Sequence, residues 1–448
     1  PCQNINSAKD LTMSHHHHKH EAISSTGAEN PYSRRLFMQQ GMAFLSMATT
    51  VPLFMQRSAE GVMLPVGSLV SSQPGIPEDH TLVVIQLGGG NDGLNTVIPY
   101  GDSMYYKNRP QIAIKQSDAL EIPGADGYGL HPNLTGIRDL LDNGNAAIVQ
   151  GVGYPNPNRS HFTSTDIWHT ANNDAQGYGW LGKYFDNTCA GKPNPAGSIA
   201  IGNKSPLALY GQTQMAVNFE TEELFKWAGT TVNSTLGETY DDINRKETTQ
   251  ANNRDSQLDF LLRTSLDAQV SSDRIRAAVA KEPLLRYPDG KLAQQLQLIG
   301  SMIRADLPTR VYYASLSGFD THANQLNNHA NLMRQLGDAL NTFQKDLTKQ
   351  GNSGKVVTMV FSEFGRRVAQ NGSAGTDHGT AAPMFLIGDN VQNGLIGKHP
   401  SLTDLDNGDL KFNTDFREVY TAVLEDWMGA NAQTILGKKY AKANVLKR

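Results

Sequence analysis

The feature that most constrains the fold is a set of short apolar runs that alternate with segments of helical periodicity. Each run has the length of one strand and is closed by glycine or polar residues, a pattern typical of strands buried on both faces of a parallel sheet. Strands that alternate with helices predict an α/β domain with a largely parallel central sheet flanked by helices. The expected strands are residues 82–87, 146–152, 310–316, 356–361 and 383–387, and the expected helices are residues 134–141, 178–187, 326–350 and 416–428.

Two further regions differ from this alternating body. Residues 221–306 carry helix formers at helical spacing and almost no strand pattern, which predicts a helical insertion or cap on a domain that spans residues 77–448. Residues 1–30 are polar, show no apolar period and contain the His-rich run 15–20, which predicts a disordered N-terminal tail. That tail could bind a transition metal, although a tag or an unstructured tail is the simpler interpretation.

Residues 31–60 have the pattern of a twin-arginine export signal. Arg34 and Arg35 are followed by Phe37 and by an uncharged, modestly apolar run over residues 36–56, an arrangement typical of such signals. We therefore expect an exported, periplasmic protein that meets the twin-arginine translocase, and an uncleaved signal that remains as a membrane anchor is the alternative. The mature body has one cysteine, Cys189, so it contains no internal disulfide.

The charge and the first glycine-rich loop exclude two classes of function. The 448 residues carry a net charge of -4 and no dense stripe of Lys and Arg, so the chain lacks the electrostatic footprint of a nucleic-acid-binding protein. The spacing of Gly88, Gly90 and Gly93 matches a dinucleotide-binding pattern, but β-branched residues and Pro99 follow it. Because no helix N-terminus is then available for a pyrophosphate, we reject that interpretation.

Polar, glycine-flanked motifs follow three of the expected strands, and a fourth such motif comes shortly after the last of them. Ligands of such sheets bind beyond the carboxyl ends of the strands, so these motifs bring several carboxylates and two imidazoles to one edge. Asp, Glu and His together are the ligand set of divalent metals. Each motif alone is also compatible with ordinary turn chemistry, but the four together predict a metal site with candidate ligands Asp92, Asp320, His322, Glu363, Asp377 and His378.

Ser160 is the candidate nucleophile. It follows a segment rich in Pro and Asn and precedes a helical pattern that runs through Ile167 and Trp168, so its hydroxyl is expected beside the positive end of a helix dipole. The alternative is that Ser160 serves only as the N-cap of that helix. A Ser-His-Asp hydrolase is not favoured, because no Gly-x-Ser-x-Gly sequence occurs.

The motifs, taken in order, resemble those of the domain-of-unknown-function 1501 family. The resemblance extends from the twin-arginine leader almost to the C-terminus and rests on residues 87–96, 159–162, 179–182, 319–322, 362–366 and 375–379. The family looks like a branch of the alkaline phosphatase and sulfatase superfamily, whose members hydrolyse phosphate or sulfate esters at a metal centre. The resemblance implies an alkaline phosphatase-like core and one or two divalent cations, with Zn, Mg, Ca and Mn all open.

The same resemblance implies roles for single residues. Asp92, Asp320, His322 and His378 resemble metal ligands of the superfamily, and Ser160 falls where its nucleophile stands. Glu363 follows its strand where the superfamily generally has an Asp-His pair, and Phe364 replaces the histidine. One metal subsite is therefore short of a ligand, which leaves open a single ion, His161 as the missing ligand, or a site that has lost catalysis.

The expected function is that of an exported, metal-dependent hydrolase of a small-molecule phosphate or sulfate ester. The cation would polarise the ester oxygens and activate Ser160 or a bound water. Asn91, Arg159 and His161 are the candidates to hold the anionic group, and Arg is best suited to a bidentate grip. The alternative is a non-catalytic exported binding or assembly protein that retains the sulfatase-like fold.

Overall fold

The computed structural model describes residues 79–188, 197–202, 204–212, 216–219 and 274–447. The predicted His-rich tail, the twin-arginine segment and residues 221–273 of the predicted insertion lie outside these ranges, so what the sequence predicts for them stays a prediction. Within the described ranges, no helix combines the length and the apolar character needed to cross a bilayer.

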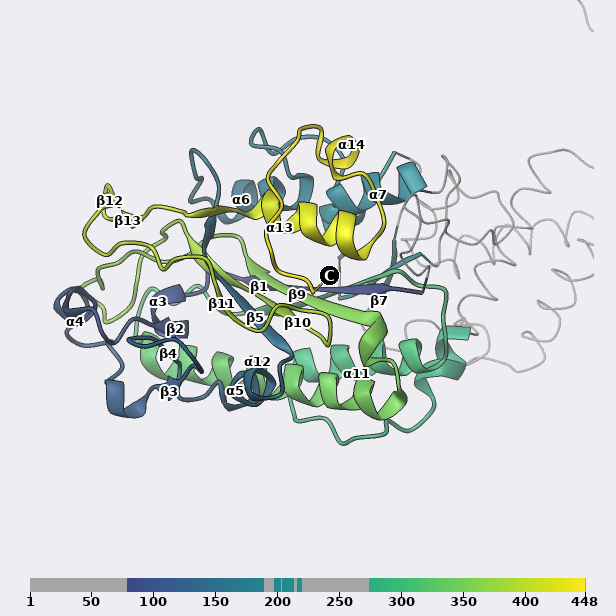
Figure 1. Cartoon of the computed structure of the whole chain (residues 1–448), viewed down its shortest axis with the longest axis horizontal. Helices are drawn as coiled ribbons and strands as arrows, with labels where there is room; N and C mark the ends of the chain where they lie inside the picture. Colours follow the sequence, from purple (N-terminus) through teal and green to yellow (C-terminus); the bar gives the residue numbers. More distant parts are fainter. Residues whose placement is uncertain (1–78, 189–196, 203, 213–215, 220–273, 448) are drawn as a thin grey trace, which may run out of the picture. The chain divides into compact units, whose positions relative to one another are not determined.

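A nine-stranded sheet forms the centre of the fold (Figure 1). Its strands lie in the order β11-β5-β10-β9-β1-β8-β6-β7, and β14 pairs with β5. β10 runs antiparallel to both of its neighbours, and every other pair of neighbouring described strands in this sheet is parallel. The predicted α/β fold with a largely parallel sheet is confirmed. The strands are β1 (Thr81–Gly88), β5 (Ala146–Gly153), β6 (Ser198–Ile201), β7 (Val217–Phe219), β8 (Val311–Ser317), β9 (Val356–Ser362), β10 (Ala382–Ile387), β11 (Gly394–Ile396) and β14 (Thr414–Asp415).

Helices cover both faces of this sheet, as Figure 1 shows. Alternate residues of β1 explain why its whole run is apolar: Leu82 and Val84 join the core on one face, and Val83 and Ile85 join the core on the other. One face carries α6 (His161–Thr170), α7 (Trp180–Thr188), α13 (Phe416–Ala422) and α14 (Ala432–Leu436), and the other carries α5 (Thr135–Asp142), α11 (Lys291–Arg304) and α12 (Gln325–Gln350).

Two helices refine what the sequence predicts. α11 falls in the segment predicted as a helical insertion, and it is helical, but Leu296 and Ile299 belong to the core beneath the sheet. The helix predicted over residues 416–428 is α13 followed by a π-helical turn at Val423–Trp427. α5 and α12 are in close contact at Gly136 and Gly337. The contact is so close that a Cβ on Gly136 would overlap the carbonyl oxygen of Gly337.

Short helices and strands lie at the edge of the sheet where the parallel strands have their carboxyl ends. They are α3 (Gly93–Thr96), α4 (Ser103–Asn108), the small sheet β2 (Val97–Ile98), β3 (Leu120–Glu121) and β4 (Gly129–Leu130), and the hairpin β12 (Leu405–Asp406) and β13 (Asp409–Leu410). The connection 363–381 joins β9 to the antiparallel β10, so it begins and ends at this same edge. The loops that follow β1, β5, β8 and β9 therefore meet here.

Candidate metal centre

Three histidines and one aspartate meet where these loops converge. His161 begins α6, Asp320 and His322 follow β8, and His378 lies in the connection between β9 and β10. The Oδ1 atom of Asp320 lies 3.0 Å from Nε2 of His322, 3.1 Å from Nε2 of His378 and 3.5 Å from Nε2 of His161. Four side chains from three separate loops thus direct their donor atoms at one point.

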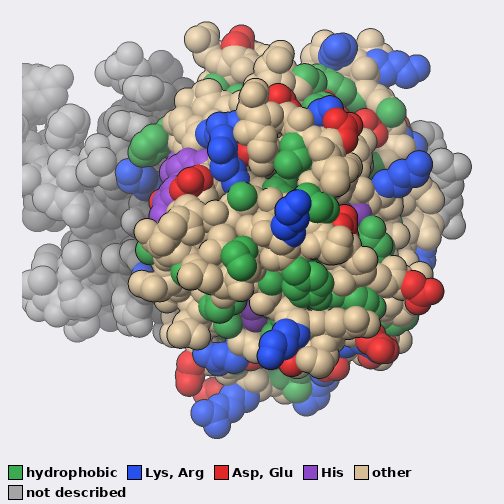
Figure 2. Space-filling model, turned by 90° about the vertical axis from the view of Figure 1, so that its left-hand side faces the viewer, with side chains coloured by type: hydrophobic (Ala, Val, Ile, Leu, Met, Phe, Trp, Pro, Cys, Tyr) green, Lys and Arg blue, Asp and Glu red, His purple; other side chains and the backbone are tan. Residues whose placement is uncertain are grey.

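The centre is open to solvent. The side chains of Asp320 and His322 are 48% and 45% exposed, whereas Nε2 of His161 is buried and has no hydrogen-bond partner within the described part of the chain. Figure 2, which faces the left-hand side of Figure 1, shows a group of histidine side chains at the surface with acidic and basic side chains beside it. A small molecule in solution can therefore reach this edge.

The opposite ring nitrogen of each histidine faces an acceptor. Nδ1 of His161 lies 2.9 Å from Oε1 of Glu363, Nδ1 of His322 lies 3.2 Å from Oδ1 of Asp377, and Nδ1 of His378 lies 2.8 Å from the carbonyl oxygen of Arg159. A carbonyl oxygen only accepts, and so does an ionised carboxylate, so each Nδ1 carries a proton. Nε2 then donates to Asp320 when the imidazole is protonated and presents a lone pair when the imidazole is neutral.

Carboxylates set the electrostatics of the centre. The hydrogen bond to Glu363 raises the pKa of His161, partly offset by burial. Partial burial acts to raise the pKa of Asp320, but hydrogen bonds from Arg366 and His378 outweigh it and lower that pKa to about 2. The hydrogen bond from Asn371 lowers the pKa of Asp377 despite some desolvation. The carboxylates that favour a proton on an imidazole equally favour a divalent cation.

The donor set fits one metal ion. His161, Asp320 and His378 each offer one ligand atom, and these atoms lie within 4.8 Å of one another. Tetrahedral coordination with bonds of about 2.0–2.2 Å places neighbouring donors about 3.3–3.6 Å apart, close to the separations of 3.0–3.5 Å around Asp320. Nδ1–H groups held by carboxylates or carbonyls are the usual outer shell of histidine ligands. The two ring nitrogens of His322 and His378 that lie 2.9 Å apart also need a proton or a cation between them.

Arg366 fixes the loops around this centre. Its guanidinium is fully buried and donates to the carbonyl oxygens of Gly89, Gly90, Phe319 and Thr376. A further hydrogen bond of 2.7 Å reaches Oδ1 of Asp320. One side chain thus joins the loop after β1, the loop after β8 and the connection that carries His378.

The structure places the predicted ligands in three groups. Asp320, His322 and His378 meet in the centre, and His161, predicted to hold the anion or to supply the missing ligand, joins them. Glu363 and Asp377 instead hold the outer ring nitrogens of His161 and His322. Asp92 forms a buried ion pair of 2.6 Å with Arg109. Burial acts to raise the pKa of Asp92, but the pairing with Arg109 outweighs it and lowers that pKa.

Besides His161, the other three candidates for nucleophile and anion binding lie in different surroundings. Ser160 is exposed at the N-cap position of α6, and its hydroxyl makes no capping hydrogen bond. Arg159 pairs with Asp409, whose pKa is raised by burial although two arginines face it. Asn91 is fully buried, and its Oδ1 lies 3.0 Å from Nε2 of His329.

The sequence did not predict the side chains that pair with Asp92, Asp320 and Arg159. Arg109, Arg366 and Asp409 contact Asp92, Asp320 and Arg159 across 17, 46 and 250 residues of sequence. Arg366 lies inside the quoted 362–366 motif, which was the available signal for it. For Arg109 and Asp409 the sequence carries no signal that we can identify.

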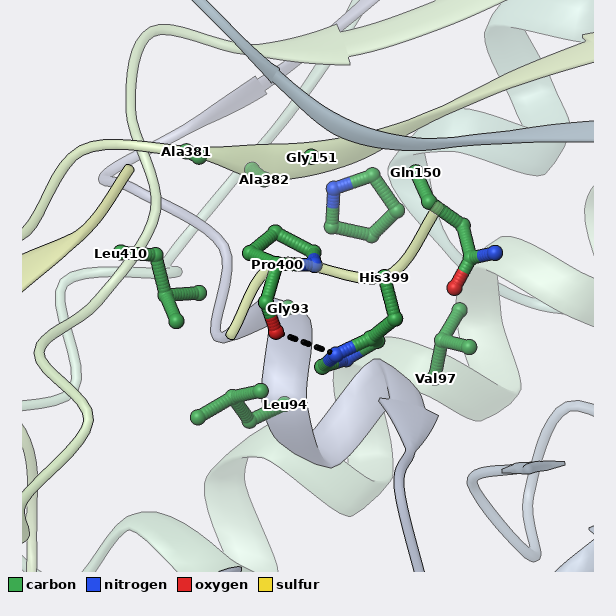
Figure 3. A pocket seen from close by; sticks show the side chains of 11 residues that line it. Gly93, Leu94, Val97, Gln150, Gly151, Ala381, Ala382, His399, Pro400 and Leu410 are labelled. Atoms are coloured by element: carbon green, nitrogen blue, oxygen red, sulfur yellow. Dashed lines mark hydrogen bonds between the residues drawn. The ribbon is translucent and has the colours of Figure 1, made fainter. Parts of the chain in front are cut away.

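A pocket at α3 is too small for a substrate. It lies between α3, the end of β5, the start of β10 and the residues His399 and Pro400 (Figure 3), and its volume of about 20 Å³ has room for about one water molecule. The Nδ1 atom of His399 lies 2.8 Å from the carbonyl oxygen of its neighbour Pro400, and the same pocket is lined by Gln150, whose Oε1 has no partner among the described residues.

Comparisons with known proteins place the chain in a family. No curated protein matches the sequence. Among solved structures, the chain is similar to the C-terminal periplasmic domain of EcEptC from Escherichia coli in complex with Zn, with 9% identity, a TM-score of 0.36, and 73% of this chain and 77% of that chain covered. It is also similar to a protein in the alkaline phosphatase superfamily from Vibrio parahaemolyticus, with 8% identity, a TM-score of 0.34, and coverage of 78% and 70%. The PsFucS1 sulfatase from Pseudoalteromonas sp. is similar at 9% identity, a TM-score of 0.31, and coverage of 82% and 70%.

Similarities at these TM-scores carry no argument about the activity. The sequence itself is more specific, because the model of one family matches residues 143–430, more than half of the chain. That range contains His161, Asp320, His322 and His378, all four side chains that converge in the centre. The chain belongs to the family described as protein of unknown function (DUF1501).

Proposed function

We propose that this chain is an exported, metal-dependent hydrolase of phosphate or sulfate esters. One observation carries the proposal: the Nε2 atoms of His161, His322 and His378 converge on Oδ1 of Asp320, while an acceptor holds each opposite Nδ1. When the imidazoles are neutral, their Nε2 lone pairs and the carboxylate oxygen of Asp320 lie close together. A divalent cation bound between them would satisfy these electron-pair donors.

The proposed roles of the chain's own residues follow from these contacts. His161, Asp320 and His378 would bind the ion, and His322 would be a fourth ligand at the exposed side. Glu363 holds the ring of His161 in the orientation that points Nε2 inward, and the carbonyl of Arg159 does the same for His378. The bound ion would polarise an ester oxygen and lower the pKa of a nearby hydroxyl or water.

Ser160 is the proposed nucleophile. It stands between Arg159, whose carbonyl accepts from His378, and His161, so chain connectivity keeps its hydroxyl within about 10 Å of the centre. Its exposed hydroxyl has no capping partner and lies at the N-terminus of the 10-residue helix α6, where the helix dipole favours a developing negative charge. The motif order that resembles the alkaline phosphatase and sulfatase superfamily supports an ester as the substrate.

Export is supported by the sequence alone. Arg34, Arg35 and the uncharged run that follows them have the pattern of a twin-arginine signal. A folded route of export suits a protein that takes up its metal before it leaves the cytoplasm, because that order controls which ion enters the site.

A second candidate function has its own observation. Arg366 donates to the same Asp320 oxygen that the three histidines face, and Asp409 neutralises Arg159. Both pairings can satisfy these side chains without a metal or an anion, as a binding or assembly protein that keeps the fold but lacks catalysis would require.

Hydrolysis of 4-nitrophenyl phosphate and 4-nitrophenyl sulfate, with added Zn, Mg, Ca or Mn, decides between the two functions. The proposal expects turnover with at least one ion, and a loss of about a thousandfold or more in kcat for Ser160→Ala. Thr163→Ala, which removes another hydroxyl from the first turn of α6, should leave the rate unchanged. A protein that binds no metal and hydrolyses neither ester would support the non-catalytic alternative.

A further inference from the structure

A cavity of about 330 Å³ adjoins the candidate metal centre. It lies between the segment after β5, the end of β9 and the segment around the β12–β13 hairpin. Tyr154, Trp168 and Phe364 belong to its inner wall and are almost fully buried. Asn156 and Lys411 line it as well and are exposed, which places the mouth between them. The volume is within the range of small-molecule sites.

The inner wall is rigid and aromatic. The ring of Trp168 stacks on Phe361 and Phe416 with centroid separations of 5.0 Å and 4.3 Å. Phe364 is held on its other side, because a Cβ on Gly90 would overlap its ring. Phe412 adds a further aromatic side chain to the lining. A preformed apolar wall of this kind favours a flat or cyclic ligand, since little ordering is needed when the ligand binds.

Two residues connect this cavity to the metal centre. Glu363 and Phe364 both line the cavity. On the side of the centre, Glu363 contacts Nδ1 of His161, and the ring of Phe364 lies 5.0 Å from that of His161 and 4.9 Å from that of His378. A molecule in the cavity is therefore separated from the proposed ligands by the thickness of one side chain.

The charges at the mouth do not select for a second anion. Lys411 forms an ion pair with Asp404 beside the cavity, and Asp406 contributes a carboxylate to the lining. Carboxylates thus outnumber ammonium groups at the entrance, and the interior wall is largely uncharged. A neutral group matches both regions, whereas a second anionic group would be repelled by the entrance.

We propose that this cavity binds a neutral, ring-bearing organic group, the alcohol part of an ester whose anionic part lies at His161, Asp320 and His378. The assignment of that group to the substrate rests on the proposed hydrolase function. The ester would cross the edge of Phe364, so that one molecule contacts both the cavity and the centre. Phe364 then determines specificity, which gives a role to the residue that stands where the superfamily generally has a histidine.

Binding of benzyl alcohol to the full chain, measured by ligand-observed NMR titration, tests the cavity independently of catalysis. Lys411→Trp places a large ring at the mouth from an exposed position and should weaken binding by about tenfold or more, equivalent to about 1.4 kcal/mol. The matched control is Lys398→Trp, an exposed lysine outside the cavity lining, which should bind benzyl alcohol as the unmodified chain does. Absence of binding, or equal affinity in both variants, would overturn the proposal.

Two synthetic esters then separate this proposal from the proposed hydrolase function. Lys411→Trp should raise KM for benzyl phosphate by about tenfold and leave KM for methyl phosphate unchanged. If both esters are hydrolysed and neither KM changes, the cavity does not hold the alcohol part and the proposal fails. If benzyl alcohol binds as predicted but neither ester is hydrolysed, the ligand site stands while the hydrolase function and the assignment of that group to a substrate fail.

Discussion

Replacement of Asp92 by Asn should destabilise the protein rather than empty the metal centre. Asp92 and Arg109 have no exposed surface, and their ion pair is 2.6 Å long. Asp92→Asn leaves the guanidinium buried without a counter-charge, and breaking a buried pair in this way costs about 3–5 kcal/mol of unfolding free energy. Arg109 retains acceptors in Asn95 and in the carbonyls of Val368 and Arg367, so we expect about 3 kcal/mol.

The assay is urea unfolding followed by circular dichroism, with EDTA present so that metal binding does not contribute to stability. Asp142→Asn is the matched control, since Asp142 is 51% exposed and pairs with Arg138 at the surface, so its replacement should change the free energy of unfolding by only about 0.5 kcal/mol. Metal affinity should fall in Asp320→Asn and be retained in folded Asp92→Asn, because Asp320 lies in the centre and Asp92 pairs with Arg109 instead.

A double-mutant cycle tests the origin of the loss. Asp92→Asn combined with Arg109→Met should be less destabilised than the sum of the two single variants, since no charge then remains buried alone. The reasoning is refuted if Asp92→Asn unfolds within about 1 kcal/mol of the unmodified chain and loses its metal. That result would return Asp92 to the ligand set that the resemblance implies.

Three further predictions concern the core and the outer shell of the centre. Burial lowers the pKa of His131 and His169 to about 3 and that of His329 to about 4. Below about pH 6.5 the unfolded chain therefore takes up protons at these histidines while the folded chain does not. As the pH is lowered from about 6.5 to about 4, the free energy of unfolding should decrease by up to about 1.4 kcal/mol per pH unit for each histidine. A flat stability profile over that window in denaturant titrations would contradict this. Glu363→Gln should weaken metal affinity by about 10- to 100-fold, measured by competition with a chelating dye, and unchanged affinity would remove Glu363 from the outer shell. Gly136→Ala should lower the free energy of unfolding by about 1–3 kcal/mol, because the added methyl group forces α5 and α12 apart. Gly354→Ala is the control and should have no such effect, because a Cβ there meets nothing within 4 Å. Equal stabilities of the two variants would disprove the close helix contact.

Much of the fold follows from local patterns. The five predicted strands became β1, β5, β8, β9 and β10, because strands buried on both faces must be apolar along their whole length. The direction of β10 was not predictable, since an apolar run has no signal for its orientation. The sequence predicts α11 as part of an insertion and not as part of the layer beneath the sheet. Helical periodicity indicates that one face of a helix is buried, but it does not indicate which element that face packs against.

The sequence predicts where candidate side chains gather but not the side chains that pair with them, and their roles stay predictions. The rule that ligands gather beyond the carboxyl ends of parallel strands brought Asp320, His322 and His378 together correctly. The positions of Asp92 and Arg159 depend on Arg109 and Asp409, which are distant in sequence and lie in no recognisable motif. Whether a carboxylate binds a metal or an arginine is decided by such long-range pairings, and no local pattern records them.

The metal content of the purified chain tests the central claim most directly. The full chain should be used with His15, His16, His17, His18 and His20 replaced by Gln, so that the His-rich tail does not bind metal itself. After equilibration with Zn and removal of free ion, elemental analysis by mass spectrometry should find about one ion per chain. The ion should be lost from a variant that carries His161→Ala and His378→Ala and retained by folded Asp92→Asn. An unmodified centre without metal, or a double variant that keeps the ion, would contradict the account.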